Sequence, residues 1–132
     1  MKKFILTLLS AVFLFAQHGT TNDPDLKLYL KGEYKKSFEG FEKRCKKNDA
    51  YACGMVGYMY NKGIGTKKDL NKAVSFYKKG CKLNDADSCT LLAYYYYKGN
   101  IVKQDTNKAV LLLKKACKLG NKSACNYLKQ FK

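Results

Sequence analysis

The sequence contains no tryptophan and only one proline, one histidine and one arginine among its 132 residues. The single histidine, His18, lies close to the N-terminus, which leaves catalytic triads without a base and histidine-based zinc sites without a ligand set. No Cys-x-x-Cys motif occurs, so thioredoxin-type redox chemistry is disfavoured as well. With Arg44 as the only arginine, the bidentate contacts of nucleic-acid readers lack their usual donor. We therefore expect no metal, no cofactor and no nucleic acid partner.

Acidic residues are also scarce, because 10 Asp and Glu stand against 26 Lys and Arg and leave a formal net charge of +16. A field of this sign attracts acidic surfaces at low salt, which makes an acidic surface one candidate partner. A solvated, lysine-rich exterior explains the same composition without a specific ligand. The sequence favours this second interpretation over specific polyanion binding.

Long apolar runs are confined to the N-terminal region. Residues 1–3 include two lysines, residues 4–15 are almost wholly apolar, and Ala16 is a small residue suited to cleavage. This order is typical of a secretory signal peptide, and the run is shorter than the roughly 18 residues that span a bilayer. The sequence predicts a signal peptide at 1–16, a flexible segment at 17–23, and a bacterial protein that is periplasmic or secreted. After cleavage of the signal we expect no stable membrane insertion.

Cysteine, in contrast, is plentiful. The six cysteines form pairs that are eight residues apart and recur every 36 residues, at positions 45, 53, 81, 89, 117 and 125. Other residues keep the same period, since the sequence Asn-Lys-Ala-Val at 71–74 recurs at 107–110. Self-similarity at this period is the mark of stacked supersecondary units. An even number of cysteines in a small exported protein also indicates a disulfide framework.

The spacing of apolar residues within each period indicates α-helices and no strands. Tyr34, Phe38, Phe41 and Cys45 are separated by four, three and four residues, which places them on one helical face. Asp69 and the aspartate one period later precede helical segments, and we expect them to cap the helix N-termini. The predicted units of a solenoid at 24–132 are a partial repeat at 24–47, repeats at 50–82 and 86–118, and a capping helix at 122–132.

Helical geometry limits how the cysteines can pair. Residues eight apart in one helix lie about 12 Å apart along its axis, whereas a disulfide bridges Cα atoms no more than roughly 7 Å apart. Each close pair therefore needs a chain reversal between its members, and an Asn-Asp or Gly-Asn turn lies at each of those points. Of the 15 possible connectivities repeat symmetry leaves two, and pairing 53–81 and 89–117 would leave the outermost cysteines unpaired. The favoured bonds are Cys45–Cys53, Cys81–Cys89 and Cys117–Cys125.

The glycines, the Asp-x-x-Lys-Ala element and the cysteine pair together resemble the Sel1-like repeat (SLR), and in particular the disulfide-bonded Helicobacter cysteine-rich protein family. One copy of the motif consists of Gly57, Tyr60, Gly63, Gly65, Asp69, Lys72, Ala73, Cys81 and Cys89. The second copy consists of Ala93, Tyr96, Gly99, Asp105, Lys108, Ala109, Cys117 and Cys125. The resemblance covers roughly residues 45–125, and the second copy departs from the first at Ala93 and Ile101, where the first has glycines.

This resemblance implies an all-α fold, an α/α-hairpin solenoid that forms a right-handed superhelix related to tetratricopeptide arrays, with one disulfide per repeat. It also implies an exported bacterial protein that works by binding partners. Some members of the family carry a penicillin-binding or β-lactamase label, so a β-lactam-binding protein or weak β-lactamase is the alternative function.

The residues offer little support for that alternative. Serine β-lactamases use a Ser-x-x-Lys element, and Ser75 and Lys78 have this spacing. The further Ser-Asp-Asn and Lys-Thr-Gly elements are absent, and Ser75 is expected in the middle of a helix, away from the N-terminal dipole that favours a nucleophile. The sequence therefore favours a protein that is not an enzyme. If it is one, a β-lactamase, a hydrolase acting on cyclic amides, is the expected class.

Four consecutive tyrosines at 94–97 are the most suggestive feature for binding, because successive helical residues turn by about 100° and cannot all face the core. The repeats of an α-solenoid build an extended concave surface, which we expect the first helix of each hairpin to line. A Tyr/Met groove rimmed by lysines on this surface would suit an extended peptide with an acidic or carboxylate group. The predicted binding residues are Met55, Tyr58, Met59, Lys62, Leu91, Tyr94, Tyr95 and Lys98.

The same eight residues could instead pack between the repeats, and the sequence does not decide between these two roles. A periodic scaffold without a catalytic constellation favours a binding function. The predicted partner is a protein, a peptide or a peptidoglycan fragment, and the predicted oligomeric state is a monomer.

Overall fold

The computed structural model describes residues 22–131, and all of the regular structure in this range is helical. The predicted signal peptide at 1–16 and most of the segment at 17–23 lie outside the described residues. The helices are α3 (Pro24–Leu30), α4 (Tyr34–Lys46), α5 (Ala50–Lys62), α6 (Leu70–Lys82), α7 (Ala86–Lys98), α8 (Thr106–Lys118), α9 (Lys122–Leu128) and the 3-10 helix η1 (Lys129–Phe131). The predicted all-α fold class is confirmed.

Polar residues start the helices. The carboxylates of Asp69 and Asp105 accept hydrogen bonds from the backbone N–H three residues later, at 3.0 and 2.9 Å, so their predicted capping role is confirmed. Asp49, Asp85 and Asn121 cap α5, α7 and α9 in the same way. Each of these side chains satisfies one of the backbone donors that a helix N-terminus leaves open.

Residues with a left-handed backbone end the helices. Gly63 and Gly99 follow α5 and α7 with φ angles of 69° and 70°. Asn48 and Asn84 adopt φ angles of 66° and 71° in the short turns after α4 and α6. Glycine and asparagine tolerate this conformation better than other residues, so the chain reverses at the same point of each repeat.

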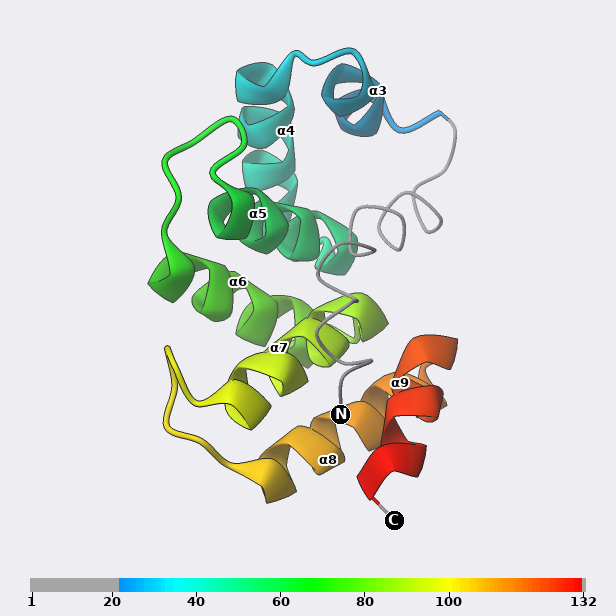
Figure 1. The fold of residues 1–132 in the computed structure, drawn as a ribbon. Coiled ribbons are helices and arrows are strands. Elements are labelled where there is room, and N and C mark those ends of the chain that lie inside the picture. Colours follow the sequence, from blue (N-terminus) through cyan, green and yellow to red (C-terminus); the bar gives the residue numbers. More distant parts are fainter. Residues whose placement is uncertain (1–21, 132) are drawn as a thin grey trace.

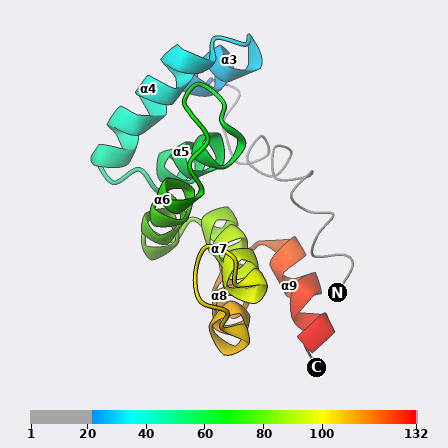
Figure 2. The same cartoon turned by 60° about the vertical axis from the view of Figure 1, so that its left-hand side comes forward.

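The helices pack mainly against their sequence neighbours and form one continuous stack, which runs from α3 at one end to α9 at the other (Figure 1). The stack is curved, and α3 and α9 project on the same side of it (Figure 2). The helices α5 and α7, which begin successive repeats, also contact each other. Phe41, Tyr77 and Leu113 are spaced by one period and are fully buried, so each repeat contributes one large side chain to the core at the same position.

The three disulfides are the predicted ones. They join Cys45 to Cys53, Cys81 to Cys89 and Cys117 to Cys125, with Cα–Cα distances of 4.6, 4.6 and 4.8 Å. Each bond links the last turn of one helix to the first turn of the next across the chain reversal. Closing loops of this length contributes about 2–3 kcal/mol each, a large fraction of the stability of a small domain.

Two lysines form hydrogen bonds between successive repeats. Lys79 on α6 donates to the carbonyl oxygen of Cys45 at 2.9 Å, and Lys115 on α8 donates to that of Cys81 at 2.7 Å. Both acceptors lie in the last turn of the preceding member of the set α4, α6 and α8, here called the outer helices. Each acceptor also receives a hydrogen bond from the backbone N–H of the asparagine in the following turn. At the N-terminal end, Arg44 forms ion pairs with three aspartates and thereby ties α3, α4 and the start of α5 together.

None of the helices in the described residues is both long and apolar enough to cross a membrane.

Candidate binding site

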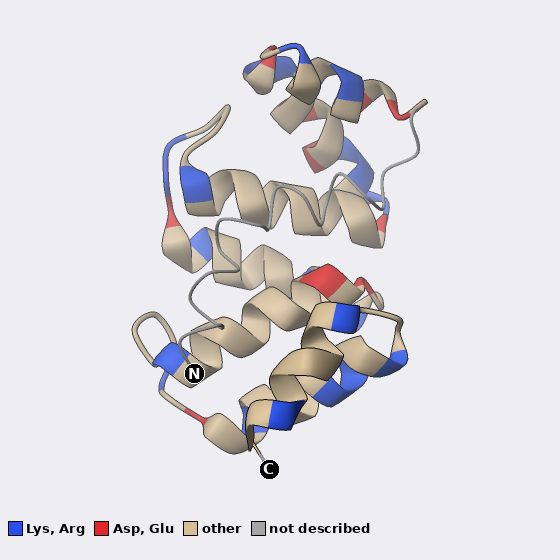
Figure 3. Cartoon of the chain, turned by 45° about the vertical axis from the view of Figure 1, so that its right-hand side comes forward, with Lys and Arg blue, Asp and Glu red and all other residues tan. Residues whose placement is uncertain are grey.

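The helices α5 and α7 carry almost no charge, although the molecule is strongly basic. Lys62 is the only charged residue of α5, and α7 carries only Asp87 and Lys98. The outer helices α6 and α8 carry four lysines each. Figure 3 shows this separation, with α5 and α7 largely free of the blue and red that mark charged residues. The structure thus divides into a charge-poor, tyrosine-rich side and a cationic side.

The eight predicted binding residues lie on α5 and α7 in equivalent positions of the two repeats. The two lysines are exposed, Tyr94 is half-buried, and the remaining five side chains are buried. The buried five are Met55, Tyr58, Met59, Leu91 and Tyr95. The Met59 side chain ends beneath the loop that follows α5. Its terminal carbon would lie 3.2 Å from a Cβ atom added at Gly65, which belongs to that loop. The binding role of these residues remains a prediction.

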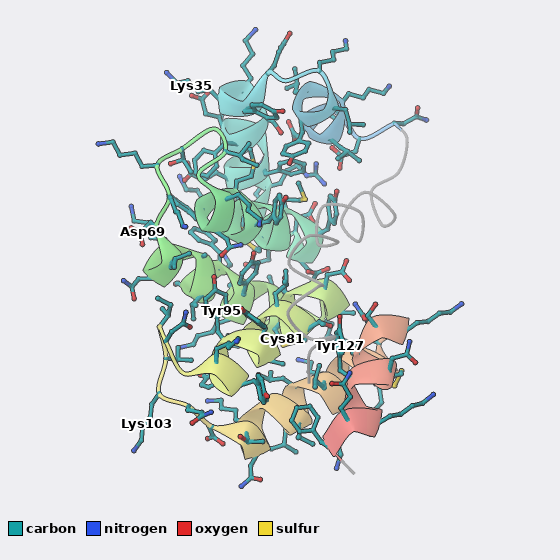
Figure 4. The ribbon with its side chains drawn as sticks, in the orientation of Figure 1. Lys35, Asp69, Cys81, Tyr95, Lys103 and Tyr127 are labelled. Carbon is teal, nitrogen blue, oxygen red and sulfur yellow. A yellow bond between two sulfur atoms is a disulfide. The ribbon has the colours of Figure 1, made fainter. Side chains whose placement is uncertain are left out.

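Aromatic contacts organise the part of α7 that faces α5 and α6. The rings of Tyr94 and Tyr95 meet edge to face at 5.8 Å, and the Tyr95 ring also contacts Tyr77 on α6 at 6.2 Å. Figure 4 marks Tyr95 at this junction of α6 and α7. The Lys98 ammonium lies 6.0 Å from the centroid of the Tyr94 ring, within the range of a cation–π contact. The Tyr95 hydroxyl donates a hydrogen bond to the side-chain oxygen of Asn61 on α5.

A hollow of about 250 Å³ opens beside these aromatic rings, where the C-terminal ends of α5 and α7 meet the start of α6. Its lining residues are Asn61, Lys62, Lys68, Leu70, Tyr94, Tyr95 and Asn100. Three of them, Lys62, Tyr94 and Tyr95, are among the predicted binding residues. Burial raises the pKa of Tyr94 and raises that of Tyr95 to about 12, so both hydroxyls are protonated at neutral pH.

Sequence reasoning missed the other four lining residues. Asn61, Lys68, Leu70 and Asn100 lie at helix ends and in loops, outside the helical face that the periodicity defines. A comparison of the two repeats with each other provides the missing signal, because each of these four residues differs from its equivalent 36 positions away.

The alternative catalytic pair lies elsewhere. Ser75 and Lys78 are both exposed on α6, which spans Leu70–Lys82 and belongs to the cationic side of the molecule. The serine lies in the interior of the helix, away from the N-terminal amides that would stabilise a nucleophile or an oxyanion. In residues 22–131 no group of three or more His, Cys, Asp or Glu side chains is arranged to hold a metal ion.

The comparison with protein families assigns the repeats. A family model described as the Sel1 repeat matches residues 50–85 and 86–121, which begin with α5 and α7 and end after α6 and α8. The chain belongs to the Sel1 repeat family. Sel1 repeats form protein-interaction scaffolds that are generally not enzymes. The resemblance derived from the glycines, the Asp-x-x-Lys-Ala element and the cysteine pairs is thereby confirmed.

Solved structures with the same Sel1 fold include cysteine rich protein B of Helicobacter pylori. It is 34% identical, the alignment covers 92% of this chain and 94% of that one, and the TM-score is 0.73. A Sel1 repeat protein of Oxalobacter formigenes is 23% identical with a TM-score of 0.73, over 79% of this chain and 43% of that chain. A protective antigen of uropathogenic Escherichia coli with an SLR fold is 21% identical with a TM-score of 0.68, over 95% and 25% of the chains. No curated protein shows a significant sequence match.

The disulfides and the relatives indicate the kind of cellular compartment in which such a Sel1 repeat protein is found. Three disulfides within one small domain are typical of extracellular or periplasmic proteins, where thiols are not kept reduced. The relative from Helicobacter pylori, whose name describes it as cysteine rich, matches nearly the whole chain. The chain spans less than half of the other two structures, which are longer.

Proposed function

We propose that this protein is an exported, disulfide-bonded Sel1 scaffold that binds a protein or peptide partner on the side formed by α5 and α7. The observation that carries the proposal is the contrast between α5 and α7, which hold few charged residues and many tyrosines, and the lysine-rich helices α6 and α8. Tyrosine is enriched in the cores of protein interfaces, whereas lysine is depleted there, and the partly exposed Tyr94 offers its ring to a partner. A curved stack of repeats also offers an extended surface for a peptide.

The contacts of Tyr94 make it the side chain on which we expect binding to depend most. It is partly exposed, lines the hollow, and its ring contacts both Tyr95 and the Lys98 ammonium. These contacts hold the ring in place before a partner arrives, so little conformational entropy is lost on binding.

A selection of random peptides displayed on phage, with purified oxidised protein as the target, tests the proposal. For selected peptides we expect Tyr94→Ala to raise the dissociation constant at least about tenfold, which corresponds to about 1.4 kcal/mol. The matched control is Tyr34→Ala, which removes an exposed tyrosine at the start of α4 and should change the constant by less than about twofold.

Two outcomes would contradict this proposal. The first is that no peptide is selected, or that both tyrosine variants weaken binding equally. The second is binding that vanishes at raised salt, because screening removes attraction between exposed charges but leaves the contact with the Tyr94 ring. That second outcome would instead favour an acidic surface, such as an acidic cell-wall polymer, held by the strongly positive net charge.

We do not propose catalysis at Ser75. Nucleophilic catalysis needs a base or a lowered pKa to activate the hydroxyl, and Ser75 is solvent-exposed within the lysine-bearing helix α6. We expect any nitrocefin hydrolysis by the purified protein to be the same in Ser75→Ala as in the wild-type chain. Hydrolysis that is lost in Ser75→Ala would support a β-lactamase instead.

Export and monomeric state also belong to this proposal. We propose that residues 1–16 are a cleaved signal peptide and that the remaining chain is periplasmic or secreted. N-terminal sequencing of protein from a periplasmic fraction should begin near Gln17, and light scattering of the same material should give the monomer mass. An uncleaved N-terminus in a membrane fraction would overturn the export proposal.

A further inference from the structure

The hollow between α5 and α7 is lined by positively charged and uncharged residues only. Its seven lining residues include two lysines and two asparagines but no aspartate or glutamate. Within residues 22–131, the ammonium groups of Lys62 and Lys68 take part in no ion pair. The carboxylate of Asp69, next to Lys68 in the sequence, caps α6 by accepting from the Lys72 amide and does not line the hollow. The hollow therefore offers positive charge and hydrogen-bond donors to a ligand.

The Tyr95 hydroxyl orients one of these donors. It donates to the side-chain oxygen of Asn61, so the amide nitrogen of Asn61 is the end that is left to contact a ligand. Tyr95 is itself held among the rings of Tyr77 and Tyr94. A donor fixed by a packed side chain binds an acceptor with less loss of conformational freedom than a mobile one.

A comparison of the two repeats shows that the hollow is not a requirement of the Sel1 fold. Residues that the fold needs recur after 36 positions, as Ala73 recurs as Ala109 and the capping Asp69 recurs as Asp105. Five of the seven lining residues do not recur. Their equivalents are Tyr97 for Asn61, Gln104 for Lys68, Thr106 for Leu70, Met59 for Tyr95 and Ile64 for Asn100. The polar character of the hollow is thus specific to this one junction between repeats.

The volume of the hollow limits what it can hold. A volume of about 250 Å³ is below the roughly 300–1,000 Å³ of pockets that enclose a whole small-molecule ligand. It suits one end group, such as a carboxylate with the carbon atoms next to it. Leu70 supplies an apolar wall for those carbons.

We propose that this hollow is a carboxylate-binding subsite, in which Lys62, Lys68 and the amides of Asn61 and Asn100 hold a carboxylate of a bound peptide. The proposal rests on the proposed peptide-binding function and adds to it the chemical group that the partner must carry. The carboxylate comes either from the C-terminus of the peptide or from an aspartate or glutamate side chain. The lysines supply charge, and the asparagine amides supply hydrogen bonds.

The test uses three small probes and the purified oxidised chain, with binding followed by NMR through the side-chain amide signals of Asn61 and Asn100. The probes are N-acetyl-alanyl-alanine with a free C-terminal acid, its C-terminal amide, and N-acetyl-alanyl-glutamyl-alanine amide. We expect at least one acid to bind at least about tenfold more tightly than the neutral amide. The free C-terminal acid tests the chain-end source of the carboxylate, and the glutamyl probe tests the side-chain source.

A charge-matched pair of variants separates the hollow from the general field of the protein. Lys62→Gln combined with Lys68→Gln should weaken binding of the preferred acid at least about tenfold. The control combines Lys67→Gln with Lys103→Gln, two exposed loop positions outside the hollow, of which Lys103 points away from the fold in Figure 4. It removes the same charge and should weaken binding by less than about twofold. All four positions are exposed, so we expect both variants to fold.

Equal binding of acid and amide, absence of binding by both acids, or equal loss in the two double variants would overturn the subsite. These results are distinguishable from failure of the proposed function. If phage-selected peptides bind through Tyr94 but neither acid enters the hollow, the subsite is refuted and the binding function stands. If no peptide is selected while an acid still perturbs Asn61 and Asn100, the subsite stands and the peptide partner does not.

Discussion

At the scale of single residues, Tyr77 shows how one position of a repeat can depart from its equivalents. Phe41, Tyr77 and Leu113 occupy the same core position, and all three are fully buried. Only the tyrosine brings a hydroxyl into this layer, and that hydroxyl has no hydrogen-bond partner. Burial also raises the pKa of Tyr77 well above its ordinary value, since the charged form would be still more costly there.

We predict that Tyr77→Phe raises the free energy of unfolding by about 1 kcal/mol, because an unsatisfied buried hydroxyl is removed while the ring is kept. Urea denaturation of the oxidised protein, followed by circular dichroism, measures the change. Tyr95→Phe is the matched control of opposite sign, because its hydroxyl bonds to Asn61 and its loss should cost about 1 kcal/mol. Destabilisation by both substitutions would contradict the account of Tyr77.

At the scale of the element, the adjacent lysines of the repeat motif have different roles. Lys79 reaches back one repeat to the carbonyl of Cys45, whereas Lys78 is exposed. Lys115 repeats the contact to Cys81 on the next helix, and its neighbour Lys114 is exposed. A cation at a helix C-terminus adds a charge-assisted hydrogen bond to a terminal carbonyl and interacts favourably with the helix dipole. The inner member of each pair therefore joins successive outer helices.

We predict that Lys79→Met lowers the free energy of unfolding by about 1.5 kcal/mol, the usual contribution of a hydrogen bond from a charged donor. Lys78→Met carries the same change of side chain and charge, and we expect it to alter the stability by less than about 0.5 kcal/mol. Urea denaturation with the disulfides intact compares the two. The interpretation fails if the two variants are equally stable.

At the scale of the whole molecule, the curved stack has ends, and the ends differ from the middle. The cysteines of the first two disulfides are at most 4% exposed. Both cysteines of the third bond, Cys117 and Cys125, are partly exposed, because no further outer helix stacks on α8 within the described residues. Thiol–disulfide exchange requires access of the attacking group to sulfur.

We therefore predict that Cys117–Cys125 is the first bond to open when the folded protein is treated with a limiting amount of a thiol reductant. Alkylation of the freed thiols followed by peptide mass spectrometry identifies the bond. In the urea-unfolded chain, where accessibility is equalised, the three bonds should be reduced at comparable rates. Earlier opening of Cys81–Cys89 in the folded protein would show that burial does not set the order.

The sequence predicted the helices, their caps and the disulfides because these features depend on short-range rules that the 36-residue period repeats. Asp69 caps its helix through residues three positions away, and Cys81 must meet Cys89 because a turn lies between them. The candidate site was predicted only in part. Tyr94, Tyr95 and Lys62 line the hollow, but Asn61, Lys68 and Asn100 were not foreseen, since the course of the loops follows no helical period.

By itself the sequence determined the repeat, the helical register and the pairing of the cysteines, since each follows from local geometry copied three times along the chain. Only the tertiary structure decided how residues of neighbouring repeats meet. The stacking of α5 on α6 and α7 buries Met59 beneath a loop and opens a hollow lined with positive charge beside Tyr95. The physical reason is that side-chain burial and cavities depend on contacts between residues about one period apart, and periodicity alone does not specify the shape of those contacts.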